Sequence, residues 1–148
     1  MARVNVEALL RAPVLLRGIR LGMPVDVIFD RDRRRAVGLE VHCGDESRRF
    51  LPWSVVRIAP GTIDVASPLV LIEEPQLAFY AKRGATLRAL RRSRVLSHGT
   101  RVGTLADLVL DDDGTISDVV TITESGRETV AYGPQVELVP ERSVRAAS

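Results

Sequence analysis

The chain has 148 residues, of which 45% are hydrophobic and 27% charged, and its formal net charge at pH 7 is +2. The composition is ordinary for a globular protein, and so small a net charge does not by itself indicate a nucleic-acid partner. A chain of this length forms one domain or two small ones.

Cysteine content and hydropathy further limit the classes of protein to which the chain can belong. Cys43 is the only cysteine, which excludes an intrachain disulfide and a cysteine metal cluster, and we interpret it as a small buried apolar residue. Arg11 and Pro13 interrupt the N-terminal apolar run, and no stretch approaches the length of a membrane-spanning helix. We therefore expect a cytoplasmic protein that is not an integral membrane protein.

The first half of the chain is predicted to consist mainly of strands and turns. Asn5 is placed to cap a short helix over Val6–Arg11. Pro60-Gly61 predicts a turn, and Gly38 predicts a bulge or a close approach between strands. The strands that we expect here are Pro24–Asp30, Arg35–Cys43, Arg48–Leu51, Val55–Ile58 and Thr62–Ala66.

The spacing of apolar residues changes to a helical period in 75–90, where Leu87 and Leu90 are among the apolar positions. We interpret 75–94 as a basic linker that is partly helical. It divides the chain into a first unit over 14–74 and a second unit over 95–146.

The second half is organised around a hairpin. Asp111-Asp112-Asp113-Gly114 predicts a sharp turn between two β-rich runs. Gly103 precedes the first of these runs and, having no Cβ, lets another strand pack closely. The strands that we expect are Val95–Leu96, Val102–Asp111, Ile116–Thr123, Glu128–Tyr132, Val136–Val139 and Arg142–Arg145.

The two halves repeat each other. Val27-Ile28-Phe29-Asp30 matches a run 81 positions later, and Val56, Ile58 and Pro60 match residues 80 positions later. Before the hairpin, Leu16–Arg20 reads like Leu87–Arg91, 71 positions later. We infer a duplication in which the first unit is shortened by about ten residues relative to the second.

The order Gly99-x-x-Val102-Gly103-x-Leu105-x-Asp107, followed by Leu-Val-Leu-Asp and then Asp-Gly, resembles the opening of a PRC-barrel domain. This family of small β-barrels includes the cytoplasmic domain of the photosynthetic reaction-centre H subunit and the C-terminal domain of a ribosome-maturation factor. Leu51-Pro52-Trp53 is similar to a closing element of the family. The resemblance implies a mainly β protein of two small PRC-type β-barrels in tandem. It also implies a non-catalytic module that docks on other macromolecules.

Catalytic, cofactor and metal sites are not predicted. With Gly114 at the sixth position of a calcium loop, Val109 and Val120 occupy the first and twelfth positions, where the loop needs acidic ligands. His42 and His98 are the only histidines, and His42 and Cys43 point to opposite faces of their strand. We therefore expect a protein that is not an enzyme.

Two surfaces are candidates for binding a partner. On a helix, Arg88, Arg91 and Arg92 share one face, with Leu87 and Leu90 toward the body of the protein. Trp53 either fills the end of the first unit or, if exposed, anchors a partner. We expect the partner to be another protein, a macromolecular complex or a second copy of the chain, with RNA as the second choice.

Overall fold

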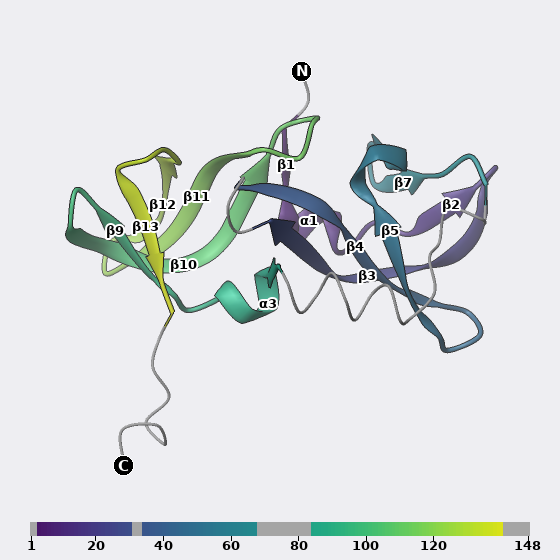
Figure 1. Ribbon diagram of the computed structural model, residues 1–148, viewed down its shortest axis with the longest axis horizontal. Helices are drawn as coiled ribbons and strands as arrows, with labels where there is room; N and C mark the ends of the chain where they lie inside the picture. The colour runs from purple at the N-terminus through teal and green to yellow at the C-terminus, as the bar shows by residue number, and fades with distance from the viewer. Residues whose placement is uncertain (1–2, 31–33, 68–83, 141–148) are drawn as a thin grey trace, which may run out of the picture.

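The computed structural model describes residues 3–30, 34–67 and 84–140. Of these residues, 61% lie in strands and 9% in helices, which confirms the mainly β prediction. Figure 1 shows two sheets side by side along the long axis of the molecule, with the N-terminal strand and helix between them. None of the helices in these ranges combines the length and the apolar character needed to cross a bilayer.

The first sheet has seven strands in the order β5-β4-β3-β2-β7-β6, with β8 beside β3. A short 3-10 turn, η1, covers Trp53–Val55. The strand bounds are β2 Val14–Leu16, β3 Ile19–Asp30, β4 Arg35–Cys43, β5 Arg48–Pro52, β6 Arg57–Ala59, β7 Thr62–Asp64 and β8 Ala85–Thr86.

The second sheet has six strands in the order β12-β11-β10-β9-β13, with β1 beside β10. The α-helices within the described ranges are α1, Val6–Leu9, and α3, Leu87–Leu90. The strand bounds are β1 Val4–Asn5, β9 Arg94–Ser97, β10 Thr100–Leu110, β11 Ile116–Thr123, β12 Gly126–Ala131 and β13 Val136–Val139. The predicted bounds of β4, β11 and β13 are confirmed.

The two halves exchange a strand and a helix. β1 comes from the N-terminus but pairs with β10 of the second half, where Val4 lies opposite Leu110. β8 precedes the second half but pairs with β3 of the first, where Ala85 lies opposite Phe29. The two pairs are related by the same 81-residue offset, so the exchange is reciprocal.

A buried aspartate holds each exchanged segment. Asp107 is 1% exposed, and its Oδ1 accepts hydrogen bonds from the backbone N–H groups of Leu108 at 2.8 Å and Glu7 at 3.0 Å. Its equivalent, Asp26, accepts from Val27 at 2.8 Å and Arg88 at 3.2 Å. Each carboxylate therefore satisfies a helix N–H group that has no partner within its own helix.

The predicted capping of α1 by the Asn5 side chain is wrong: Asn5 is the N-cap residue, but its side chain makes no capping hydrogen bond. Its Nδ2 instead donates to Oδ2 of Asp107 at 3.3 Å, because the aspartate of the other half occupies the capping position.

The two sheets meet through backbone contacts that are related by a local two-fold symmetry. Arg35 and Thr115, 80 residues apart, form an isolated antiparallel bridge. On either side of this bridge, Ala36 N–H donates to Gly114 O at 2.8 Å and Ile116 N–H donates to Arg34 O at 3.1 Å. One continuous apolar core draws on both sheets, and its fully buried members include Val27, Leu39, Ile63, Leu108, Val119 and Val136.

The turn before the long strand corrects the alignment of 16–20 with 87–91. Arg17 and Gly18 have φ angles of 50° and 82°, and His98 and Gly99 have 51° and 80°. Both pairs form two-residue hairpin turns, of the kind that needs φ above zero at both positions. The offset there is 81, so the ten-residue shortening of the first half is wrong. The residues 16–20 form a hairpin turn with the strand ends beside it, whereas 87–91 begin with helix α3, so the two leucine–arginine patterns are not structurally equivalent.

The predicted linker is described only from Gly84 onward, and its earlier residues lie outside the described ranges. Its described part forms β8, α3 and the start of β9, so it belongs to the two sheets. The strand predicted over Arg142–Arg145 also lies outside the described residues. Closure of each half into a barrel stays a prediction.

Candidate functional site

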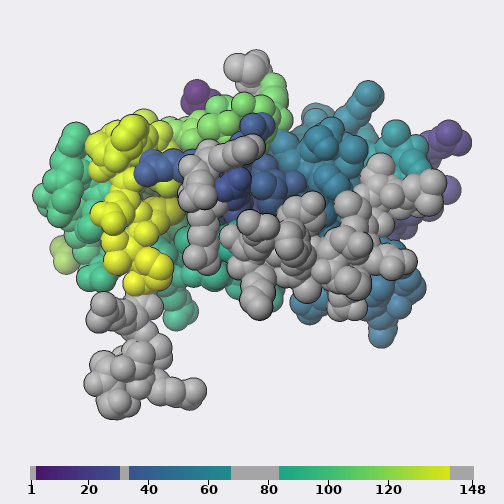
Figure 2. All heavy atoms as spheres, viewed as in Figure 1, coloured from purple at the N-terminus to yellow at the C-terminus, as the bar shows by residue number. Residues whose placement is uncertain are grey.

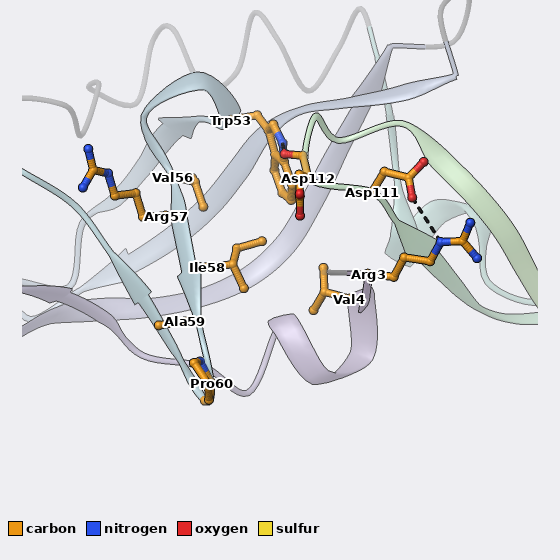
Figure 3. A pocket seen from close by; sticks show the side chains of 11 residues that line it. Arg3, Val4, Trp53, Val56, Arg57, Ile58, Ala59, Pro60, Asp111 and Asp112 are labelled. Carbon is orange, nitrogen blue, oxygen red and sulfur yellow. Dashed lines mark hydrogen bonds and ion pairs between the residues drawn. The ribbon is translucent and has the colours of Figure 1, made fainter. Parts of the chain in front are cut away.

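A surface hollow lies at the junction of the two sheets. It has a volume of about 530 Å³, and we name it the tryptophan cavity. Figure 3 shows Val4, Val56 and Ile58 pointing toward its centre, while the Arg57 side chain points away. Its lining is Arg3, Val4, Trp53, the stretch 56–61, Asp111 and Asp112.

Trp53 forms one wall of this cavity. Its side chain belongs to the shared core, and the residue is 8% exposed. Its Nε1–H donates to the backbone oxygen of Asp112 at 3.2 Å, so an indole of the first half is fixed to the hairpin of the second. The ring is therefore not the exposed anchor that one sequence interpretation required, and it packs in the core as the other interpretation expected.

The acidic hairpin turn, which adjoins Trp53, forms part of the rim. Arg3 Nε lies 3.3 Å from Asp111 Oδ1, and this ion pair appears as a dashed line in Figure 3. Thr115 N–H donates to Asp113 Oδ1 at 2.9 Å, and this hydrogen bond holds the pKa of Asp113 below its ordinary value. Asp112 is exposed at the mouth. The tryptophan cavity thus has an apolar interior and a charged rim.

A second hollow, of about 490 Å³, is the counterpart of the tryptophan cavity under the local two-fold symmetry. We name it the tyrosine cavity. Leu138 and Pro140 line it, 80 positions after Ile58 and Pro60 in the tryptophan cavity, and Asp30 lines it 81 positions before Asp111. Its lining is Phe29, Asp30, Arg34, Ala85, Ala89, Leu90, Ile116, Tyr132, Glu137, Leu138 and Pro140.

Arg34 and Tyr132 shape this second hollow. The Arg34 guanidinium lies 4.6 Å from the centre of the Tyr132 ring, a cation–π distance, and donates to Gly133 O at 2.7 Å. Burial raises the pKa of the Tyr132 hydroxyl, and the nearby Arg34 charge opposes that rise. Arg34 is therefore held in place and presents a fixed positive charge at the cavity.

The arginines predicted to bind a partner do not share a helical face. Leu87 is fully buried and Leu90 packs on the core, as predicted. The helix, however, ends at Leu90: Arg91 has an extended ψ of 142°, and Arg92 has a φ of 69°. Arg88 alone of the three lies within α3. All three are exposed, so the tract remains a charged surface without the regular spacing expected of a helix.

Cys43 and His42 are neighbours in β4 and differ in exposure. Cys43 is half-buried and His42 is exposed, and burial raises the pKa of the Cys43 thiol. Across the described ranges, no three His, Cys, Asp or Glu side chains gather as a metal site would require.

Sequence reasoning missed Ile58, Arg34 and Tyr132 as parts of a site. The match of Ile58 and Pro60 to residues 80 positions later was visible, but it was read only as evidence of duplication. Comparison of the sequence with protein-family models and with curated proteins finds no match.

Proposed function

We propose that this protein is a non-catalytic interaction module of two PRC-barrel-like halves, acting as a protein-binding or assembly adaptor in the bacterial cytoplasm. The observation that carries the proposal is the pair of hollows at the sheet junction. Each has apolar side chains open to solvent and charged groups at its rim. An apolar centre with a polar rim is the usual anatomy of a protein-binding surface.

The exposure of individual apolar residues supports the same function. Ile58, which lines the tryptophan cavity, is 37% exposed. β6, which carries Ile58, is the last strand of its sheet and pairs only with β7 within the described chain. Such an edge, beside an open apolar hollow, suits an extended segment of another protein.

RNA or ribosome binding is the second candidate function. It is favoured by Arg88, Arg91, Arg92 and Arg94, which are exposed and make no ion pair with the described residues. Binding through such a tract would weaken steeply with salt, because neutralised phosphates release counterions.

Capture from bacterial lysate, with and without nuclease, tests the proposal. The variant Ile58→Glu/Leu138→Glu places a charge in both cavities. Its control is Ile122→Glu, which changes an exposed apolar residue that lines neither cavity. We expect the wild-type protein and the control to retain the same specific proteins after nuclease treatment, and the double variant to lose them.

Nuclease-sensitive capture would replace the protein-binding function with the RNA one. Equal capture by the double variant would show that the cavities do not bind the partner. Thermal unfolding of each variant, followed by circular dichroism, confirms that it is folded.

A further inference from the structure

The tyrosine cavity is bordered by a charged segment that forms no ion pair with the described residues. We define the arginine tract as Arg88, Arg91, Arg92 and Arg94. All four residues are exposed. Within the described ranges, the ion pairs of the molecule involve other arginines: Arg3, Arg11, Arg48, Arg49 and Arg127. The tract therefore concentrates positive charge at one place.

The tract and the tyrosine cavity are continuous. Ala89 and Leu90 line the cavity, Arg88 directly precedes them and Arg91 directly follows them. Figure 2 shows this face, where the yellow spheres of β13 border the teal spheres of β9 and α3. Arg34, fixed against Tyr132, adds a charge from the first half. An apolar hollow thus has arginines on two of its sides.

We propose that the tyrosine cavity and the arginine tract together bind an acidic peptide segment of a partner protein, with one bulky apolar side chain in the cavity. This rests on the proposed protein-binding function and names the chemistry of the partner. The apolar side chain contacts Leu90 and Leu138, and flanking carboxylates pair with Arg88 and Arg91. Arginine suits this role because its planar guanidinium can pair with a carboxylate through two parallel hydrogen bonds.

Two features favour a peptide over a nucleic acid. Asp30 and Glu137 line the same cavity and repel a phosphate chain, whereas an uncharged side chain enters between them. Tyr132 lines the cavity, and Arg34 covers its ring face. Base stacking requires an open ring face.

Selection of peptides from a random dodecapeptide phage library on the immobilised full-length protein tests this inference. We expect the enriched peptides to be acidic and to share one Leu, Ile, Met or Phe. Fluorescence anisotropy then gives the dissociation constant of the best peptide. Replacing its apolar residue by serine should weaken binding about tenfold, the loss expected from one buried apolar side chain.

Paired variants locate the site. Arg88→Gln/Arg91→Gln should weaken peptide binding about fivefold or more, as expected for two exposed ion pairs. The control is Arg17→Gln/Arg20→Gln, which removes the same charge from two exposed arginines, one in the β2–β3 turn and one at the start of β3. We expect this control to bind within about twofold of the wild type. Equal weakening by both variants would reduce the effect to net charge and overturn the site.

The library also separates failure of this inference from failure of the proposed function. Enrichment of basic or neutral apolar peptides would leave a protein-binding module but overturn the acidic partner. If no peptide is enriched and a ten-nucleotide oligouridylate binds to the wild type but not to Arg88→Gln/Arg91→Gln, both proposals fail and the RNA function replaces them.

Discussion

The two halves share their hairpins but complete their sheets differently. In the second half, β13 pairs antiparallel with β9. At the equivalent place in the first half, β7 pairs parallel with β2, and β6 is displaced to the edge. The stretch that aligns with β13 at an offset of 80 is therefore the outer strand of its sheet. A repeated sequence does not guarantee a repeated strand position when one copy continues into an additional strand.

The contacts at the local two-fold relation also differ. Trp53 lies 80 positions before Gly133, and Arg34 lies 80 positions before Gly114. A Cβ on Gly114 would lie 2.9 Å from Trp53 Nε1, so the bulky ring needs the glycine opposite it. In the other copy of the contact, Arg34 donates to Gly133 O. Both bulky residues of these contacts, Trp53 and Arg34, belong to the first half, and both glycines belong to the second. The tryptophan cavity therefore has an indole wall where the tyrosine cavity has a guanidinium.

The largest effect is expected from the substitution that removes the indole, and with it this asymmetry. Trp53→Ala deletes a buried side chain of the shared core and its hydrogen bond to Asp112 O. We expect the free energy of unfolding to fall by about 3–5 kcal/mol. Chemical denaturation followed by far-ultraviolet circular dichroism measures it. Trp53→Phe keeps a ring and should lose less; an equal loss would assign the effect to the indole N–H rather than to packing.

The next largest effect is expected from substitutions that disrupt the exchange of segments between the two halves. Leu9 is 1% exposed and its equivalent, Leu90, is half-buried. Leu9→Ala should cost about 2–5 kcal/mol, and Leu90→Ala less. Because α1 and β1 pack on β10, hydrogen exchange should accelerate at β10 in Leu9→Ala and at β3 in Leu90→Ala. Acceleration confined to the N-terminal half in Leu9→Ala would contradict the exchange.

Substitution of the two buried aspartates compares how strongly each exchanged segment is held. Asp107 accepts three hydrogen bonds and Asp26 accepts two. Hydrogen bonds to charged groups contribute about 1.5–3 kcal/mol each when a buried partner is left unpaired. We expect Asp107→Ala to destabilise the protein more than Asp26→Ala, by denaturation in urea at pH 7. The reverse order would show that the count of hydrogen bonds does not decide the effect.

The smallest effect concerns the acidic turn of the second half. Asp113 has a folded pKa below its ordinary value, so it binds fewer protons folded than unfolded. Its stabilisation is complete above the ordinary carboxyl pKa of about 3.9 and is lost as the pH falls through the folded value. Asp113→Asn should slightly flatten the decline of melting temperature between neutral and acidic pH. An unchanged profile would show that this exposed turn does not contribute.

Local patterns determined much of the fold. The strands β4, β11 and β13 follow from alternating side chains between turn residues, because the two faces of a strand meet different surroundings. Gly38 was predicted as a close approach, and a Cβ there would lie 2.6 Å from Leu51 O. Gly103 lies within β10 rather than before it, but the close approach is confirmed: its Cβ would lie 2.9 Å from that of Thr121. The duplication was also readable, at offsets of 81 and 80.

Only the tertiary structure decided the exchange and the cavities. β1 and β8 have two residues each, too few for any periodic signal, and their partners lie about a hundred and about sixty residues away. The sequence contained one signal, an aspartate inside an apolar strand at both Asp26 and Asp107. The role of these aspartates becomes clear only from the helix N–H groups that fold against them. A buried carboxylate is stable only with such donors, and no local pattern shows which distant segment supplies them.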